Sequence, residues 1–463
     1  MEARDFDLIV IGAGPGGYVA AIRAAQLGLK AAVVERDRVG GVCLNVGCIP
    51  SKSLIRQAEL VRSIPGLEAL GAKVDRSGID YARAQEKSRK AADTLSRGVQ
   101  FLLKKNGVEL IAGEATIAGP NAVAVGKATL TARSIVVATG SRPREIPGFP
   151  FDGEVVLSST DALMLRALPR RMLVLGGGAI GVEFSHVFNA FGVEVHLVEM
   201  MDRILPLEDA GTVAVLDRAL RRRGVSIATS TKAVGMERHA GGARVTLEDG
   251  SGARSTVEAD QVIVVTGRVP NTAGLGLERL GVALDRGFVP VGDGYRTKVP
   301  SVFAVGDVVG STPLLAHVAS REGEIAAEHA AGHPGQPRLD PLAIPSGVYA
   351  EPQVASFGLT EEKAKETGRA YQAVVFPYRG AGKSVAVGET EGQVKLLFDP
   401  ASREIVGAHV VGAEATELIH ELLLARAAEL LPADVADMIH AHPTLSEALM
   451  EAAKMAEGRV INI

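Results

Sequence analysis

Cys43 and Cys48 are the only cysteines among 463 residues, and they lie five positions apart. Two thiols this close in sequence could form a redox-active disulfide that exchanges with other thiols. In a regular helix this spacing would separate them by about 7.5 Å along the axis, beyond the usual Cα distance of a disulfide. Pairing would therefore require a local distortion, which Gly47 and Pro50 would favour. The alternative is that both are unpaired and pack near a turn as small apolar side chains.

The composition is that of an ordinary globular protein, with 47% hydrophobic and 22% charged residues and a formal net charge of −4. A chain of this length exceeds what one hydrophobic core usually supports, so several domains are expected. The balanced charge provides no global field towards nucleic acids or anionic membranes, and neither partner is expected. The N-terminus lacks the basic start of a signal peptide, no apolar stretch is long enough to cross a bilayer, and two cysteines make no secreted disulfide framework. We therefore expect a cytoplasmic protein, without a metal site.

A dinucleotide-binding pattern precedes the cysteines. An apolar strand over 8–11 runs into Gly12-x-Gly14-x-x-Gly17, a helix over 18–26, Gly28, and a second strand over 31–34 that leads into Glu35. Glycines at this spacing allow a tight turn and let the backbone approach a pyrophosphate at a helix N-terminus. The acid at the strand end accepts hydrogen bonds from ribose hydroxyls. A single copy of this pattern is often only a glycine-rich turn.

The same pattern recurs in the middle of the chain. A strand over 172–175 leads into Gly176-x-Gly178-x-x-Gly181, a helical stretch to residue 190, Gly192, and a strand over 194–198 followed by Glu199. In both copies the helix-ending glycine lies 16 residues, and the acid 23 residues, after the first fingerprint glycine. The matched register argues against chance and predicts two dinucleotide-binding units.

The order of the motifs suggests which cofactor each unit binds. Two dinucleotides and one cysteine pair suggest an electron path through nicotinamide, flavin and disulfide. Because the cysteines directly follow the first unit, a redox-active ring bound there could lie against them, so we assign FAD to the first unit and the nicotinamide cofactor to the second. No arginine stands at Met200 or Met201 to hold a 2′-phosphate, which favours NAD over NADP. Arg203 leaves that preference open.

Four further segments complete a pattern that spans essentially the whole chain. They are Ala138-Thr139-Gly140-Ser141, Thr266-Gly267-Arg268-Val269-Pro270-Asn271, Val302-Phe303-Ala304-Val305-Gly306-Asp307 and Leu314-Leu315-Ala316-His317. In this order, and together with the cysteine segment, they resemble the pyridine nucleotide-disulfide oxidoreductases, in particular the members that oxidise dihydrolipoamide. The resemblance implies that Cys43 and Cys48 form the redox disulfide, with Cys43 exchanging with substrate and Cys48 facing the flavin.

The resemblance also implies the cofactor contacts. Those to FAD are Gly12, Gly14, Gly17, Glu35, Val42, Lys52, Ala115, Thr139, Gly140, Ser141, Asp307, Leu314, Leu315, Ala316 and His317, and those to NAD are Gly176, Gly178, Gly181, Glu183, Glu199 and Gly267. Lys52 matches a lysine near the flavin, and Glu183 matches its acidic partner, although each could be an ordinary exposed charge. Val42 departs from the family because threonine usually stands there, which puts one FAD contact in doubt.

The segment His440-Ala441-His442-Pro443-Thr444-Leu445-Ser446-Glu447 resembles that of the family's catalytic base. A base with a pKa near neutrality raises the reactive thiolate fraction of a dithiol substrate. The resemblance assigns this role to His442 and assigns Glu447 as the carboxylate that orients its imidazole. Thr444 and Glu447 also match a capping box for a helix over 446–456, and both functions could coexist. We expect His440 to be structural.

The resulting fold expectation is α/β, with two Rossmann-like dinucleotide-binding domains and a C-terminal α+β dimerisation domain. The expected limits are 1–146 for FAD binding, 147–269 for NAD binding, 270–339 for a central segment returning to the FAD domain, and 340–463 for the interface. In the interface domain, the alternating residue pattern over 393–398 and over 405–411 predicts two antiparallel strands. Helices over 416–430 and 446–456 should pack on them. The resemblance implies a homodimer in which each active site takes its base from the other subunit.

The expected activity is oxidation of dihydrolipoamide by NAD through the disulfide and FAD. The expected partner is the lipoyl-bearing acyltransferase or H-protein of a 2-oxoacid dehydrogenase or glycine cleavage complex, and the sequence does not distinguish these complexes. Glutathione and mercuric reductases are the nearest alternatives, but Met200 and Met201 are not the basic residues of an NADPH enzyme, and the C-terminus carries no second cysteine pair. A soluble transhydrogenase would lack one of the two cysteines. A non-catalytic nucleotide-binding scaffold is a more distant alternative.

Overall fold

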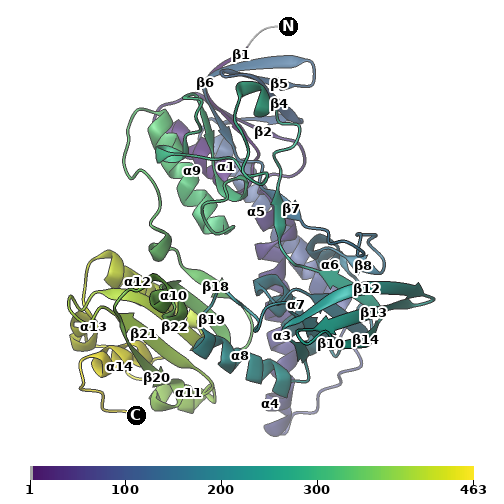
Figure 1. The fold of residues 1–463 in the computed structure, drawn as a ribbon, viewed down its shortest axis with the longest axis vertical. Helices are drawn as coiled ribbons and strands as arrows, with labels where there is room; N and C mark the ends of the chain where they lie inside the picture. Colours follow the sequence, from purple (N-terminus) through teal and green to yellow (C-terminus); the bar gives the residue numbers. More distant parts are fainter. Residues whose placement is uncertain (1–3) are drawn as a thin grey trace.

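The computed structural model describes residues 4–463, in which a mixed sheet, a parallel sheet and an antiparallel sheet each form the centre of a separate lobe (Figure 1). In the first sheet the order is β3-β2-β1-β6, all parallel, and the C-terminal half of β6 also pairs with β17. An antiparallel extension, β5 and β4, pairs with the N-terminal half of β6. The strands are β1 Arg4–Ile11, β2 Ala31–Glu35, β3 Glu109–Ala112, β4 Ala115–Gly119, β5 Ala122–Val125, β6 Ala128–Val137 and β17 Val302–Ala304.

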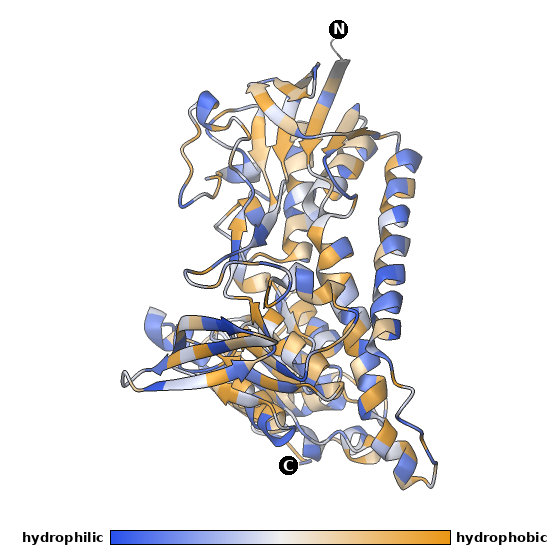
Figure 2. Cartoon of the chain, turned by 90° about the vertical axis from the view of Figure 1, so that its right-hand side faces the viewer, coloured by the Kyte–Doolittle hydropathy of each residue, from blue (hydrophilic) through white to orange (hydrophobic). Residues whose placement is uncertain are grey.

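Apolar strands explain why both faces of this sheet are covered, one by helices and the other by the β4–β5 extension and the segment 275–309. Side chains of β1 alternate between two separate cores, with Leu8 and Val10 on one face and Ile9 and Ile11 on the other. A strand buried on both faces is typical of parallel sheets, and the strands nearest the N label are mostly orange in Figure 2. Helices α1 Pro15–Gln26 and α9 Ala316–Ala330 pack on each other beside this sheet. The other helices of this part are α2 Gly41–Val46, α3 Cys48–Arg62, α4 Ile64–Ala69 and α5 Tyr81–Lys105.

The second sheet repeats the first in a smaller form. Its order is β11-β10-β9-β15-β8, with all neighbouring strands parallel, and an antiparallel layer β12-β13-β14 packs beside it. The strands are β8 Val156–Leu157, β9 Arg171–Leu175, β10 Glu194–Val198, β11 Ser226–Ala228, β12 Thr231–His239, β13 Gly242–Asp249, β14 Arg254–Ala259 and β15 Gln261–Val264. The helices are α6 Ser159–Met164, α7 Ala179–Ala190 and α8 Ala210–Arg222. The predicted duplication of the dinucleotide unit is therefore confirmed.

Two short strands connect these lobes. β7 Ser141–Pro143 leaves the first sheet and β16 Arg268–Pro270 returns to it, and the two pair antiparallel. The chain then enters the first sheet again as β17. The segments before and after the second lobe therefore lie side by side next to the first sheet.

The C-terminal lobe is an antiparallel sheet covered by helices. Its order is β18-β19-β22-β21-β20, and the predicted antiparallel pair is β21 with β22. Helices α12 and α14 pack on this sheet as expected. The strands are β18 Ser346–Val348, β19 Gln353–Gly358, β20 Gln372–Pro377, β21 Gln393–Phe398 and β22 Ile405–Gly412, and the helices are α10 Glu361–Thr367, α11 Gly382–Val387, α12 Ala415–Ala427, α13 Pro432–Asp437 and α14 Glu447–Ala456. The predicted α/β fold class with an α+β C-terminal domain is confirmed. Within residues 4–463, no helix is both long and apolar enough to span a membrane.

Candidate active site

The first fingerprint loop leaves no room for side chains at two of its three glycines. Gly12 has φ +102°, and a Cβ there would lie 2.4 Å from the carbonyl oxygen of Ala138. A Cβ at Gly17 would lie 1.9 Å from the carbonyl oxygen of Gly12. At Gly14 the nearest atom would be 4.0 Å away, so this face of the loop is open. The open face is where a pyrophosphate would approach the N-terminus of α1.

The second loop has the same shape. Gly176 has φ +116°, and a Cβ there would lie 2.6 Å from the carbonyl oxygen of Val265. A Cβ at Gly181 would lie 1.9 Å from the carbonyl oxygen of Gly176, whereas one at Gly178 would meet nothing within 4 Å. Both loops therefore combine a tight turn, a close helix–strand contact and one open glycine, which is the arrangement that a dinucleotide requires.

The two strand-end acids also occupy equivalent positions. Glu35 accepts hydrogen bonds from the backbone N–H of Ala13 at 2.7 Å and of Asp37 at 2.8 Å. Glu199 accepts from the N–H of Gly177 at 2.6 Å and of Met201 at 2.8 Å. Each carboxylate therefore holds the fingerprint loop, and its remaining lone pairs can accept hydrogen bonds from ribose hydroxyls.

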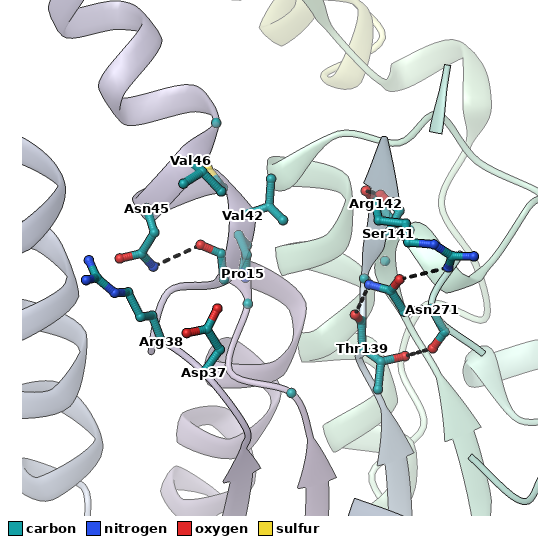
Figure 3. A pocket seen from close by; sticks show the side chains of 18 of the residues that line it. Pro15, Asp37, Arg38, Val42, Asn45, Val46, Thr139, Ser141, Arg142 and Asn271 are labelled. Atoms are coloured by element: carbon teal, nitrogen blue, oxygen red, sulfur yellow. Dashed lines mark hydrogen bonds between the residues drawn. The ribbon is translucent and has the colours of Figure 1, made fainter. Parts of the chain in front are cut away.

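A cavity of about 1630 Å³ extends from the first fingerprint loop to the cysteine pair. One wall is formed by the loop and helix α2, and the other by residues 139–142 and Asn271 (Figure 3). The predicted FAD residues that line it are Gly12, Gly14, Glu35, Val42, Lys52, Ala115, Thr139, Gly140, Ser141, Asp307, Leu314, Leu315 and Ala316. Its volume, its open glycine and its ribose-facing acid fit FAD.

Some expected contacts lie outside this cavity. Gly17 packs behind the loop, and the side chain of His317 is exposed and bonds the carbonyl oxygen of Pro345 at 2.8 Å. Gly267 lies beside Arg144, away from the cavity lining. The fingerprint glycines of the second unit and Glu199 form the separate nucleotide loop described above.

A hydrogen-bonded group on the wall formed by residues 139–142 includes Arg268, which was not predicted as a site residue. Ser141 Oγ donates to Asp307 Oδ2 at 2.5 Å and accepts from Arg268 Nε at 2.6 Å. Arg268 Nη2 also donates to the carbonyl oxygen of Ser141 at 2.8 Å. Thr139 and Asn271 form a second pair through reciprocal bonds of 2.7 and 3.0 Å (Figure 3). Arg268 and Asn271 both belong to the segment 266–271, so their presence in a matched motif was the available signal.

The cysteine segment contains the break that a pairing of the two thiols requires. Helix α2 ends at Val46, and α3 begins at Cys48. A Cβ at Gly47, between them, would lie 2.9 Å from the carbonyl oxygen of Val42. Both cysteines are half-buried, and their side chains are close enough to affect each other's ionisation.

The two thiols differ in acidity. The hydrogen bond from Cys43 lowers the pKa of Cys48 to about 7, burial opposes this shift, and the nearby Lys52 ammonium contributes to it. The same hydrogen bond and burial raise the pKa of Cys43 well above its usual range. Cys48 is therefore the more acidic of the two thiols.

Lys52 and Glu183 come from different lobes but form one ion pair. Lys52 lies one helical turn beyond Cys48 on α3, and its Nζ is 2.9 Å from both carboxylate oxygens of Glu183 on α7. Tyr349, from the C-terminal lobe, contacts both members of the pair. Three lobes therefore meet at this wall of the cavity.

His442 lies in the C-terminal lobe and does not line its own chain's cavity. Its Nδ1 is 3.0 Å from Glu447 Oε1, and its side chain is 75% exposed. Burial opposes ionisation of Glu447, but hydrogen bonds from the Thr444 N–H and from His442 lower its pKa. His440 differs because it is buried and its Nε2 lies 2.8 Å from Glu421, which is the structural role expected for it.

The expected capping box is only half formed. Glu447 Oε2 accepts from the N–H of Thr444 at 2.9 Å, but the Thr444 hydroxyl donates to the carbonyl oxygen of Ala441 instead of capping the helix. Helix α14 begins at Glu447, with Ser446 at its N-cap and no side-chain cap. The prediction of a complete box was wrong because the turn at 441–444 uses the threonine hydroxyl itself.

Polar residues that the sequence did not predict as site residues surround the end of the cavity beyond Glu35. Arg36, Asp37, Arg38, Asn45, Arg89, Asp93 and Glu114 line this region. Asn45 Nδ2 donates to the carbonyl oxygens of Val39 and Gly41, whereas its buried Oδ1 has no protein partner. These residues lie on α2, α5 and two loops, so no local motif brings them together.

Known proteins resemble this chain over nearly its whole length. The family described as pyridine nucleotide-disulphide oxidoreductase matches residues 6–323, and its dimerisation domain matches residues 344–453. A dihydrolipoyl dehydrogenase from Rhizobium etli is 43% identical over 99% of this chain and all of its own length, and one from Thermus scotoductus is 44% identical over 99% of each. The solved structure of LpdA from Mycobacterium tuberculosis is 30% identical with a TM-score of 0.89, covering 97% of this chain and 99% of that one.

Proposed function

Because this chain belongs to the pyridine nucleotide-disulphide oxidoreductase family, we propose that it oxidises dihydrolipoyl groups to lipoyl groups and reduces NAD⁺ to NADH. It is a flavoprotein disulfide oxidoreductase whose cofactors are FAD and NAD(H). The observation that carries the proposal is that Cys43 and Cys48 line the same cavity as the first fingerprint loop. The substrate is inferred from the name shared by the relatives from Rhizobium etli and Thermus scotoductus.

FAD would be held by the first fingerprint loop, Glu35 and the Ser141–Asp307 pair, and NAD by the second loop and Glu199. When bound, FAD supplies two-electron transfer between the cysteine dithiol and the nicotinamide. Arg203 lies near Pro206, Asp202 and Glu362, and the N–H of Met201 bonds Glu199. This arrangement supports NAD as the preferred nucleotide, because the loop presents a carboxylate where a 2′-phosphate would lie.

The thiol chemistry follows from the different acidities of the two cysteines. A substrate thiolate attacks Sγ of Cys43 in the oxidised protein, the Cys43–Cys48 bond breaks, and Cys48 leaves as the more stable thiolate. The second substrate thiolate then attacks the substrate sulfur of the mixed disulfide, which forms the lipoyl disulfide and releases Cys43. Two electrons pass from substrate to the pair. Reoxidation of the pair gives NADH and one proton per NAD⁺.

The proposed base is His442, acting on the site of the other subunit. The chain carries a dimerisation domain, and the protein is a homodimer. His442 is exposed, Glu447 holds its Nδ1, and its Nε2 is free to take a proton from a substrate thiol. Ile439 is 96% exposed and Leu424 is 69% exposed on the same lobe, so a subunit interface here would bury apolar surface.

We further propose that the domain limits are residues 146, 269 and 339, and that the protein acts in the cytoplasm. The lipoyl group would arrive on an acyltransferase or H-protein of a multienzyme complex. The proposed catalytic role of the cysteine pair supports this location, because cysteine pairs in the reducing cytoplasm are more often catalytic than structural.

One comparative assay tests the substrate and the nucleotide together. The purified FAD-bound enzyme is supplied with NADH or NADPH and with lipoamide, oxidised glutathione or mercuric ion, and dihydrolipoamide oxidation with NAD⁺ is measured in the forward direction. We expect the highest kcat/KM for lipoamide with NADH. Higher kcat/KM for glutathione with NADPH, or for mercuric ion, would contradict the proposal.

A further inference from the structure

Tyr349 lies where the C-terminal lobe meets the cysteine site. It directly follows β18, and its side chain packs against the hydrophobic core that includes residues of α3 and α7. Lys52 Nζ stands 4.4 Å from the centroid of its ring, and its backbone N–H donates to Glu183 Oε1 at 3.1 Å. One residue therefore contacts both members of the Lys52–Glu183 pair.

The ring gives the Lys52 ammonium a defined position. The face of an aromatic ring carries negative potential, so a cation above it is attracted. Lysine has a flexible four-carbon stem, and its other contacts near this site are Glu183 and the Ser51 hydroxyl at 3.5 Å. The ring beneath Nζ and the amide bound to Glu183 together restrict where both charges lie.

The position of these charges matters because they act on Cys48 in opposite directions. The titratable groups that affect the ionisation of the Cys48 thiol are Cys43 from α2, Lys52 from α3, Glu183 from α7 and Arg268 from β16. Lys52 favours the thiolate, whereas Glu183 opposes it. A small displacement of either charge therefore changes the fraction of Cys48 that is ionised.

We propose that Tyr349 is a positioning residue for the cysteine site, holding the Lys52–Glu183 pair so that the ammonium stays close enough to Cys48 to stabilise its thiolate. The assignment rests on the proposed redox role of Cys48. The C-terminal lobe then has a second function besides forming the subunit interface, because its Tyr349 positions the charged groups beside Cys48 in the FAD-binding lobe of the same chain.

The test uses the FAD-bound dimer in a Cys43→Ser background, where Cys48 is the only cysteine. The rate of Cys48 alkylation by iodoacetamide is measured from pH 5.5 to 9.5. At pH 6.5 we expect Tyr349→Leu to lower this rate about two- to threefold and to move the titration to higher pH. Tyr349→Phe keeps the aromatic face and should titrate like the parent.

Two further variants distinguish positioning from a general effect. Tyr371 is a tyrosine of the same lobe that bonds Glu361, so Tyr371→Leu serves as the matched control and should leave the titration unchanged. In a Lys52→Met background, Tyr349→Leu should have no further effect, since the ammonium on which Tyr349 acts is gone. FAD retention and circular dichroism verify that each variant is folded.

Three results would overturn the assignment: an unchanged titration in Tyr349→Leu, an equal change in Tyr349→Phe, or a persistent effect without Lys52. If Tyr349→Leu does not fold, Tyr349→Met fills the space with a flexible apolar side chain and is compared in the same way. The alkylation contains no dihydrolipoamide, so an error in the proposed substrate would show in the turnover assay and not in this titration.

Discussion

Two cysteines in one short segment have different chemical properties because each meets different neighbours. Both cysteines are half-buried, but Cys48 lies near the Lys52 ammonium and is the more acidic thiol, whereas the pKa of Cys43 is raised. A leaving group should be the more acidic thiol, and an attacked sulfur should be the one that substrate can reach. The acidities therefore support Cys43 as the exchange thiol and Cys48 as the thiol that faces the flavin.

Paired serine variants test these roles. Cys48→Ser should retain FAD but lack the long-wavelength thiolate-to-flavin absorbance that partial reduction produces, because the ionised thiol is gone. Cys43→Ser is the matched control and should keep this absorbance while losing lipoamide turnover. Visible spectra of both variants, recorded from pH 6 to 9, provide the measurement. Persistence of the band in Cys48→Ser would reverse the two roles.

A second residue-level prediction concerns the proposed base. Replacing His442 with glutamine should lower kcat for dihydrolipoamide oxidation about 10²- to 10⁴-fold, because substrate thiols must then ionise unaided. Raising the pH should recover part of the loss, since the thiolate fraction increases. His440→Gln is the control because His440 is held by Glu421 and has no proposed chemical role. Comparable losses in both variants would show a structural effect instead of base catalysis.

At the scale of elements, a single glycine separates two helices so that the cysteines can meet. Gly47→Ala would place a methyl group 2.9 Å from the Val42 carbonyl oxygen, so the α2–α3 junction would have to open. We expect a loss of about 1–3 kcal/mol in the free energy of unfolding and slower formation of the Cys43–Cys48 disulfide. Denaturant unfolding and thiol counting during oxidation would measure both effects. Gly66→Ala in α4 is the control because a Cβ there meets nothing within 4 Å.

Helix α7 contains a buried histidine that should make stability depend on pH. Burial and the nearby Arg62 and Arg223 charges lower the pKa of His186 to about 3. The folded chain keeps this imidazole neutral while the unfolded chain protonates it near pH 6.5, so stability is present above that pH and is lost as pH falls towards 3. The loss amounts to about 1.4 kcal/mol per pH unit per chain from this group.

The comparison of His186→Leu with the exposed His333→Gln isolates this contribution. Urea midpoints measured between pH 7.5 and 4.5 should fall less steeply in His186→Leu than in the parent, and His333→Gln should follow the parent. A parallel decline in all three proteins would mean that other groups cause the acid sensitivity.

At the scale of the whole molecule, the active site takes residues from distant parts of the chain. Lys52, Glu183 and Tyr349 come from three lobes, and β17 brings Asp307 back to the first sheet next to Ser141. His442 lies outside its own chain's cavity. The homodimer is therefore the smallest unit that could contain a complete site.

Subunit complementation tests that inference. Cys43→Ser and His442→Gln homodimers should each be nearly inactive, but a randomly exchanged mixture should recover about a quarter of wild-type activity, since half of the dimers contain one intact composite site. Coexpression with two different affinity tags would isolate the mixed dimer. No recovery in the isolated mixed dimer would show that His442 serves its own chain.

The sequence alone was sufficient for the features that repeat or that depend on local backbone geometry. The duplicated strand–glycine–helix–acid pattern located both nucleotide loops, because Gly12 and Gly176 must adopt conformations that only glycine accepts easily. The alternation over 393–398 and 405–411 also located a strand pair correctly, because successive side chains of a strand point to opposite faces, although the structure buries both faces of these strands. The spacing of Cys43 and Cys48 indicated only that pairing would require a local distortion, and the break between α2 and α3 at Gly47 provides one.

Only the tertiary structure decided which distant residues meet. Ser141 lies more than 100 residues before Arg268 and Asp307, as Lys52 does before Tyr349, and the polar residues beyond Glu35 lie on separate elements. Motifs identified some of these residues, but no local pattern shows which of them contact one another. The half-formed cap at Thr444 likewise depended on a competing acceptor in the preceding turn. Local propensity determines where elements begin and which faces are buried, whereas charge and hydrogen-bond partners in a site are determined by how those elements pack.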